Sequence, residues 1–385
     1  MDHVAAKPPL REVVDAVFRN MGIVYGNPQS LHRFGAEPAR VLDEAREKVA
    51  SLVGASPQEI FFTSSGSESN NMAIKGLAQG NQKKGRHIVV SAIEHQSVLH
   101  SCKYLEKLGF QVTQVPVDPN GIVWPDALQN ALREDTVLVS IMHANNEVGT
   151  VQDLKGLSKV VKQSKAVFHT DAVGSVGMIP AIVDELGVDS LSISAQNFYG
   201  PRGAAALYVR KGTRIVPFID GGIQEGGRRA GTENVPAIVG MGVAARIASS
   251  KMERWAAQLT PLRDMLIKGL LEMEHVRLTG HPTQRLPGTA SVLVQYIEGE
   301  SMLLMMSQQG IAVASGSACT SRALKASHVL LAMGIPHEFA HGSLLFSLGM
   351  DNTREDVEYV LEVLPPIVSK LREMSPLYRD TLQKR

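Results

Sequence analysis

The amino-acid sequence predicts an α/β fold, in which helices cover both faces of a mostly parallel sheet and a smaller α+β domain follows. Seven short apolar runs alternate with longer helical patterns, which is typical of strands that are buried on both faces and joined by helices. The predicted strands are residues 59–63, 87–91, 111–115, 136–142, 166–170, 190–194 and 205–209. Helices are expected between them at 97–108, 126–133 and 154–164.

The chain changes character after a long helical pattern that runs from 244 to about 272. Strand candidates follow at 276–279, 289–294 and 311–314, and a closing helix is expected from about 354 to 374. Thr353 is a start signal for this helix, and Ser375-Pro376 is a stop signal. We therefore expect an N-terminal segment 1–13 that packs with the small domain, a large domain 14–250 and a small domain 251–385.

Composition argues against several classes of protein. The 385 residues include 39 Lys and Arg against 38 Asp and Glu, which leaves a formal net charge of +1 and no long-range field for nucleic acid or an anionic membrane. No run approaches the ~20 apolar residues of a membrane helix, and the first residues lack the apolar core of a signal peptide. We expect a cytoplasmic protein that binds neither nucleic acid nor a membrane.

The chain has two cysteines, Cys102 and Cys319, too few for a four-ligand zinc or iron–sulfur site within one chain. Cys102 lies in a helix-like run, which predicts a small buried residue. Cys319 lies among small and hydroxyl residues in segment 314–321, without helical or strand periodicity. This segment is expected to be an exposed loop, where a reactive thiol would be accessible.

Polar segments follow several of the predicted strands. The turn at 63–71 precedes a helical run, so its backbone N–H groups and the hydroxyls of Ser65 and Ser67 suit a phosphate. The alternative is an ordinary helix start with Ser67 as N-cap. Glu94-His95 and the segments 143–149 and 169–175 also follow strands. All of these fall at the carboxyl edge of a parallel sheet, where ligands of open α/β folds bind.

With these motifs in order, nearly the whole chain resembles the cysteine desulfurases of the NifS/IscS type, which are fold-type I pyridoxal-phosphate enzymes of the class V aminotransferase family. The resemblance is carried by residues 25–32, 64–71, 93–95, 143–147, 171, 199–201, 229–233 and 315–321. It implies pyridoxal 5′-phosphate as cofactor, L-cysteine as substrate, a homodimer, and sulfur transfer through a persulfide on Cys319.

The resemblance also implies which residues hold the cofactor phosphate. Gly66 and Ser67 would contact it, Ser194 would assist, and Thr232 of the partner subunit would reach it across the dimer.

Three further residues correspond to the family's contacts with the cofactor ring. His95 would stack on the ring, and Asn146 would lie near its hydroxyl. Asp171 would pair with the ring nitrogen, so that the ring can act as an electron sink.

Four positions depart from the family. Gln196-Asn197 stands where the family has His-Lys, and the amide of Asn197 cannot replace the Schiff-base lysine as nucleophile or proton carrier. Gly174 replaces a glutamine, and Leu345 replaces the arginine that pairs with the substrate carboxylate. Lys7 is a candidate surrogate amine, since the N-terminal segment lines the substrate entrance in the family.

These departures leave three hypotheses. The first is that desulfurase catalysis is lost or weak, and that Cys319 presents a thiolate, a persulfide or a shared 2Fe–2S cluster ligand to a U-type iron–sulfur scaffold protein. The second is an active desulfurase that holds its cofactor non-covalently. The third, a related aminotransferase or selenocysteine lyase, needs the same missing lysine and leaves the Cys319 segment without a purpose.

Overall fold

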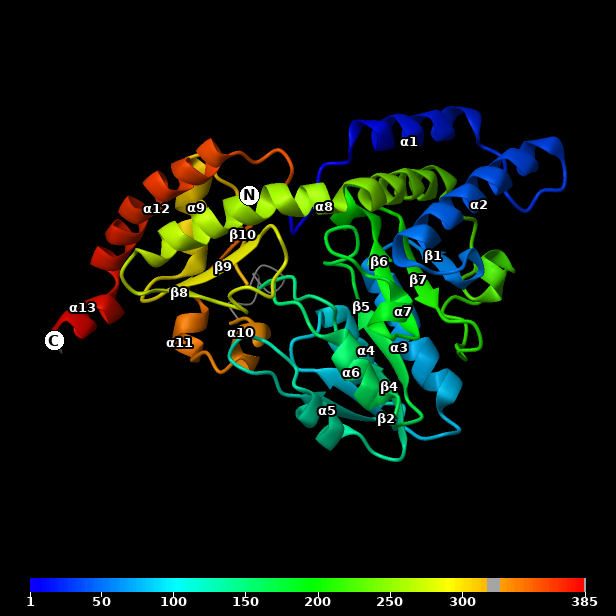
Figure 1. The fold of residues 1–385 in the computed structure, drawn as a ribbon, viewed down its shortest axis with the longest axis horizontal. Helices are drawn as coiled ribbons and strands as arrows, with labels where there is room; N and C mark the ends of the chain where they lie inside the picture. The colour runs from blue at the N-terminus through cyan, green and yellow to red at the C-terminus, as the bar shows by residue number, and fades with distance from the viewer. Residues whose placement is uncertain (317–325, 384–385) are drawn as a thin grey trace.

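The computed structural model describes residues 1–316 and 326–383, and its centre is a seven-stranded sheet (Figure 1). The strand order is β1-β7-β6-β5-β4-β2-β3, and β7 alone is antiparallel to its neighbours. The strands are β1 Ile60–Thr63, β2 His87–Ser91, β3 Gln111–Val115, β4 Thr136–Ser140, β5 Val167–Asp171, β6 Ser190–Ser194 and β7 Ala205–Val209. All seven predicted strands and the mostly parallel sheet are confirmed.

Helices cover both faces of this sheet because neighbouring residues of each strand point to opposite sides. In β2, Ile88 and Val90 pack with α3 and α4, whereas Val89 packs in the core that lies under α2, α6 and α8. The helices of the first half are α1 Arg11–Ile23, α2 Arg33–Val53, α3 Gly66–Asn81, α4 Gln96–Glu106, α5 Pro125–Ala131, α6 Leu154–Val161 and α7 Val183–Leu186. Short 3₁₀ turns occur at η1 Pro57–Glu59, η2 Ala195–Phe198 and η3 Gln224–Gly227.

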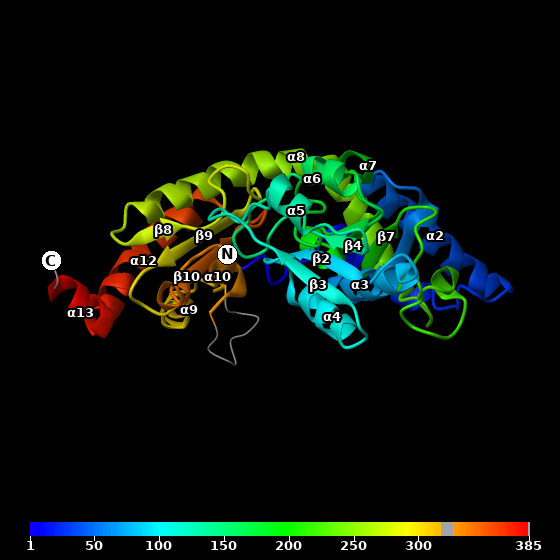
Figure 2. The same ribbon diagram turned by 90° about the horizontal axis from the view of Figure 1, so that it is seen from below.

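One long helix, α8 Val235–Leu271, connects the large sheet to a small one (Figures 1 and 2). Its first half packs in the core of the large sheet, and Leu266, Ile267 and Leu270 pack in the core of the small sheet. The helix begins at Val235, nine residues before the predicted start at 244. Asn234 is its N-cap, and the Asn234 side chain accepts a hydrogen bond from the Ala237 N–H. Its first turns are apolar and glycine-rich because α1 and α2 also pack on them, so they lack an amphipathic pattern.

The small sheet is antiparallel in the order β10-β9-β8. Its strands are β8 Val276–Leu278, β9 Thr289–Val294 and β10 Ser343–Ser347. The remaining helices are α9 Gly299–Gln308, α10 His328–Ala332, α11 His337–Ala340, α12 Arg354–Met374 and α13 Pro376–Gln383. The predicted closing helix is therefore confirmed, with Thr353 and Asp356 forming a capping box.

The predicted strand at 311–314 is wrong. This segment makes a single bridge, Ala314 to Leu345, and the third strand of the small sheet is β10. Strand β10 is buried on both faces. Its Leu-Leu-Phe run therefore does not alternate between apolar and polar residues, and hydrophobic periodicity does not mark it as a strand.

The N-terminal segment lies beside the small sheet. Asp2 forms a bridge with Ser347 at the end of β10, and the Val4 N–H donates to Ser347 Oγ at 2.7 Å. Further along, the Leu10 N–H donates to the carbonyl of Tyr199 in the large domain, at 3.1 Å. The segment thus touches both parts of the molecule, while the domain boundaries at 13 and 250 stay predictions.

A search of the described helices for one that is both long and apolar enough to cross a membrane finds none.

A buried ion pair ties the edge strand β1 to the η3 turn. The carboxylate of Glu225, whose side chain is 1% exposed, accepts two bonds from the Arg46 guanidinium of α2, both at 2.8 Å. It also accepts from the Phe62 N–H of β1 at 2.8 Å. Removing this carboxylate would leave the Phe62 N–H without this acceptor. The Arg46 guanidinium, whose side chain is 16% exposed, would keep the Ile60 carbonyl as acceptor but lose its charge partner.

We expect Glu225→Ala to lower the free energy of unfolding by about 3–5 kcal/mol, which is typical for breaking a buried ion pair. Urea unfolding followed by circular dichroism measures this. Glu37→Ala is the matched control, because the Glu37–Arg40 pair of α2 is exposed and its loss should leave the transition nearly unchanged. Equal, small shifts in both variants would contradict a stabilising role for Glu225.

Candidate active site

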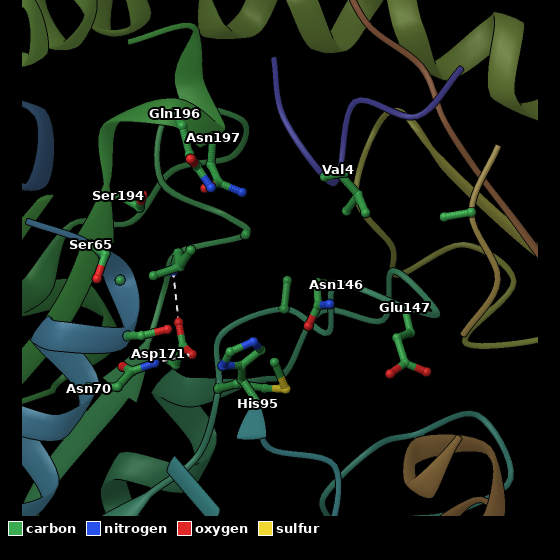
Figure 3. A pocket seen from close by; sticks show the side chains of 18 of the residues that line it. Val4, Ser65, Asn70, His95, Asn146, Glu147, Asp171, Ser194, Gln196 and Asn197 are labelled. Carbon is green, nitrogen blue, oxygen red and sulfur yellow. Dashed lines mark hydrogen bonds between the residues drawn. The ribbon is translucent and has the colours of Figure 1, made fainter. Parts of the chain in front are cut away.

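A cavity of about 500 Å³ opens at the carboxyl edge of the large sheet, between this sheet, the N-terminal segment and β10 (Figure 3). Seven residues singled out from the sequence line it together: Gly66, Ser67, His95, Asn146, Asp171, Ser194 and Asn197. They come from five different strand ends and turns. Convergence of this kind is what parallel strands with a common carboxyl edge produce.

Asp171 lies at the end of β5 in the wall of the cavity and is 4% exposed. Its Oδ2 accepts from Asn70 Nδ2 at 2.7 Å, and its Oδ1 accepts from the Val173 N–H at 3.0 Å. Asn70 is itself held by α3 and also donates to Ser97 Oγ at 2.9 Å. The carboxylate is therefore fixed in orientation, as an acceptor for a cationic or protonated ring nitrogen must be.

The N-terminus of α3 points at the same cavity. Ser65 caps the helix by accepting from the Glu68 N–H at 3.1 Å, so the prediction of Ser67 as N-cap is wrong by two residues. A Cβ on Gly66 would lie 2.6 Å from Val173 Cγ2, so a residue without a side chain is needed here. Gly66 and Ser67 leave backbone N–H groups free to bind an anion at the helix end, and Ser194 faces the same space.

His95 and Asn146 lie at the opposite side of the cavity from α3 (Figure 3). His95 Nδ1 accepts from the Ser97 N–H at 3.2 Å, which leaves Nε2 as the protonated nitrogen and fixes the ring. Asn145, by contrast, is fully buried and accepts from the N–H groups of Glu147 and Val148. Asn145 therefore shapes the loop, and Asn146 faces the cavity.

The η2 turn places Gln196 and Asn197 in the cavity wall (Figure 3). Asn197 Oδ1 is buried and accepts no hydrogen bond from the described residues. Arg202 also lines the cavity, whereas Lys211 lies in a separate pocket beyond the other end of β7. Lys211 therefore cannot replace a lysine at position 197.

The other two departures also lie in the cavity wall. Leu345 of β10 presents an apolar side chain there. At Gly174, the nearest atom that a Cβ would meet is Ala144 O at 3.6 Å, so a Cβ would fit there in ordinary van der Waals contact. The cavity therefore lacks the three functional groups that the family resemblance predicts at positions 197, 174 and 345, and it nevertheless keeps a volume of about 500 Å³.

Two of the predicted site residues are not part of this cavity as described. Thr232 is exposed and does not line it. Cys319, predicted as nucleophile and as a shared cluster ligand, lies outside the described residues. Among the residues that are described, no group of three His, Cys, Asp or Glu side chains could hold a metal ion.

The cavity-lining residues to which the sequence assigned no role include Val4, Asn70, Glu147 and Arg202. Asn70 and Glu147 lie inside the polar segments singled out, so their segments were correct and their roles were not assigned. Val4 gives no local signal, because it reaches the cavity only through the pairing of the N-terminal segment with β10.

Burial shifts the pKa of several acids around the site. It raises the pKa of Glu147 to about 7, although a hydrogen bond from Ser327 opposes this. It raises the pKa of Glu94 to about 8, although Ser91 Oγ and the Met142 N–H donate to its Oε1. Burial also raises the pKa of the Cys102 thiol to about 12, which confirms Cys102 as an unreactive core residue.

Comparison with known proteins identifies the family. A model of the class V aminotransferases matches residues 1–360. The chain belongs to this family. Among its members, the cysteine desulfurase IscS of Methanosarcina thermophila is 52% identical over 377 residues, covering 98% of this chain and 93% of the relative. The IscS of Dictyoglomus turgidum is 51% identical and covers 99% and 97%.

Solved structures of this class V aminotransferase type agree with the fold. A NifS-like protein superposes with a TM-score of 0.90 at 40% identity, covering 96% of this chain and 99% of the other. A NifS-like protein from Rickettsia africae gives a TM-score of 0.87 at 31% identity, covering 96% and 98%. The fold-type I architecture expected from the resemblance is therefore confirmed.

Pyridoxal 5′-phosphate is the cofactor of these desulfurases, and the cavity fits it on its own features. The α3 N-terminus offers a site for its phosphate, with the close approach at Gly66. Asp171, oriented by two donors, offers an acceptor for its ring nitrogen. The chain has no amine at position 197 with which to hold it covalently.

We expect Gly66→Ala to weaken pyridoxal-phosphate binding about tenfold, since overpacking costs about 1–3 kcal/mol and Val173 carries one of the donors to Asp171. A fluorescence titration with the cofactor measures this. Adding Val173→Ala removes the clashing methyl group and should restore most of the affinity, with Val173→Ala alone as control. Unchanged binding by Gly66→Ala would show that the cofactor does not approach this glycine.

Glu94 gives a pH prediction. Its folded-state pKa of about 8 lies above the ordinary value of 4.5, so the folded protein keeps a proton that the unfolded chain releases in this window. Its stabilising contribution is full below pH 4.5 and is lost as the pH rises through 8. Glu94→Gln keeps an acceptor for Ser91 and Met142 but cannot ionise.

We therefore expect the melting temperature of Glu94→Gln, relative to the unaltered protein, to increase between about pH 5 and about pH 9. Differential scanning calorimetry at a series of pH values checks this. The exposed Glu12→Gln should show no such trend. A difference for Glu94→Gln that is independent of pH would mean that Glu94 stays charged in the folded protein.

Proposed function

We propose that this chain is an active, pyridoxal-phosphate-dependent cysteine desulfurase that holds its cofactor without a covalent lysine link. It would convert L-cysteine to L-alanine and leave the sulfur as a persulfide on Cys319. One observation carries the proposal: the α3 N-terminus, His95, Asn146, Asp171 and Ser194 converge on one cavity. High identity to proteins named cysteine desulfurase IscS supports this substrate class.

The residues of the chain would divide the work of binding. Gly66 and Ser67 at the helix N-terminus would bind the phosphate, with Ser194 beside them. Asp171, held by Asn70, would keep the ring nitrogen protonated, and the fixed ring of His95 would lie against the cofactor. When bound, the cofactor supplies an electron sink for the α-carbon of an amino acid.

The sulfur transfer would require only one L-cysteine, the Cys319 thiolate and one proton. The Cβ–S bond of L-cysteine breaks, its electron pair stays on Cβ, and Cβ gains a proton to complete the methyl group of alanine. The Cys319 thiolate supplies the electron pair of the new S–S bond. In support, Ser315 and Gly316, which belong to the same segment 314–321 as Cys319, line the cavity.

A homodimer is part of this proposal. Thr232 of the partner subunit would complete the phosphate site, which is consistent with Thr232 being exposed in one chain. Large apolar side chains are exposed between residues 18 and 34, as a subunit interface would require: Phe18, Met21, Tyr25, Leu31 and Phe34.

The second candidate is a desulfurase-like protein whose catalysis is lost or weak. Here Cys319 would present a thiolate, a persulfide or a 2Fe–2S cluster ligand to a U-type iron–sulfur scaffold protein. Asn197 and Leu345 favour it, because the family's amine and carboxylate partner are both absent. We rank it second, since the relatives are named as desulfurases and loss of activity is an additional assumption.

The test is alanine and sulfide release from L-cysteine by the purified protein with added pyridoxal phosphate and a thiol reductant. We expect multiple turnovers, and without reductant we expect the mass of one extra sulfur on the peptide that contains Cys319. Cys319→Ala should abolish both signals, and the buried Cys102→Ser should leave both unchanged.

Asn197→Lys restores the family's amine and should raise the rate. Absence of alanine from the unaltered protein with cofactor bound, together with activity in Asn197→Lys, would favour the second candidate. Alanine release that does not need Cys319 would contradict both candidates.

A further inference from the structure

The amine of Lys7 lies against the residue that replaces the family's lysine. Lys7 Nζ donates to the backbone carbonyl of Asn197 at 2.7 Å, although the two residues are 190 positions apart. The same ammonium group lies 5.2 Å from the centre of the Tyr199 ring. An amine from the N-terminal segment therefore reaches the η2 turn at the site.

The surroundings of Lys7 lower the pKa of its amine toward neutral pH. Lys7 is half-buried as a residue, and burial of its amine lowers its pKa to about 7. Within the described chain no carboxylate pairs with it. The titratable groups that face it are His3, whose own pKa burial lowers, and Tyr199, whose pKa burial raises to about 12. Near pH 7 neither group competes with Lys7 for its proton.

A small cavity lined by Lys7 lies beside the main one and shares lining residues with it. It measures about 30 Å³, which is enough for one water molecule. Lys7 lines it together with Asn146, Gly174 and Asn197, and these three residues also line the main cavity. Gly174 lines both cavities without a side chain, and the nearest atom to its Cβ position is Ala144 O at 3.6 Å.

We propose that Lys7 is the proton-transfer group of this site, and that it acts on the α-carbon of the bound amino acid across the opening left by Gly174. This proposal links two departures from the family. Position 197 has lost its amine, and Lys7 supplies an amine in its place. The missing side chain at position 174 gives the Lys7 amine access to the substrate. This inference rests on the proposed function.

The transfer conserves protons and electrons. Neutral Lys7 Nζ accepts the α-proton of the substrate, directly or through one water, and becomes an ammonium group. The electron pair of the broken C–H bond remains with the substrate, where the bound cofactor stabilises it. The ammonium group later returns a proton to carbon, so Lys7 ends each cycle neutral.

The experiment follows exchange of the α-hydrogen of L-alanine in D₂O by proton NMR, with pyridoxal phosphate bound and Cys319→Ala as background. This background isolates proton transfer at carbon from sulfur chemistry. We expect Lys7→Met to slow exchange about 100-fold or more, since a general acid–base group is worth ~10²–10⁴-fold. Lys211→Met, beyond the far end of β7, is the matched control and should exchange normally.

Three further measurements separate proton transfer from a structural role. Added methylamine should restore exchange to Lys7→Ala but not affect Lys211→Met. Gly174→Gln should slow exchange with Lys7 intact, because its side chain fills the opening. The exchange rate of the protein with Lys7 should rise with pH through about 7, and Lys7→Arg should lose this inflection.

A readout without cofactor tests the amine itself. In trace acetylation of the apoprotein, quantified by peptide mass spectrometry across pH, Lys7 should react with a midpoint near 7, and Lys211 is followed in the same samples as the reference amine. A midpoint for Lys7 equal to that of Lys211 would overturn the proposal. Melting temperatures of all variants confirm that they are folded.

The experiments distinguish failure of the Lys7 proposal from failure of the desulfurase proposal. Exchange that survives Lys7→Met at the unaltered rate overturns the role of Lys7 and leaves the desulfurase proposal standing. Absence of exchange in the protein with Lys7 intact and cofactor bound overturns both. Slow exchange in Lys7→Met that methylamine does not restore, with normal melting, would assign Lys7 a positioning role for the η2 turn instead.

Discussion

The site depends on one constraint, which is the common direction of the strands of the large sheet other than β7. Because these strands are parallel, the segments that follow β1, β2, β4, β5 and β6 all emerge at the same edge. Strand β7 runs the other way, so the turn before it, with Arg202, lies at the site, while Lys211 after it lies at the far edge. This topology supplies one wall of the cavity, and the N-terminal segment and β10 contribute the other.

The electrostatics of the site come from burial more than from ion pairs. Glu94, Glu147 and Lys7 are shifted toward neutral pH mainly because water is excluded from them. The carboxylate of Asp171 is held in orientation by two hydrogen bonds, from Asn70 Nδ2 and from the Val173 N–H. Groups whose pKa values are moved toward 7 are typical of sites that exchange protons, and here Glu147 lines the main cavity and Lys7 lines the small one beside it.

Local sequence patterns predicted the elements well where each strand is a continuous apolar run between turn signals. They failed at β10, for which no strand was predicted, and at 311–314, where a short apolar segment makes one bridge only. The cap of α3 was misplaced because Ser65 and Ser67 are both suitable N-cap residues, and backbone geometry alone decides between them.

The cavity itself was predictable from polar residues at strand ends, but its closure was not. Val4 and Lys7 reach the site through contacts nearly 200 residues or more distant in sequence, and no periodicity reports such contacts. The helix α8 adds a consequence at the level of folding. One continuous helix packs with its first half in the core of the large sheet and with its last turns in the core of the small sheet. If either core unfolds, the helix loses the packing of that half, and the half that remains in the other core is weakened. The two parts are thereby coupled into one cooperative unit, and a state with only one of them folded would be poorly populated at equilibrium.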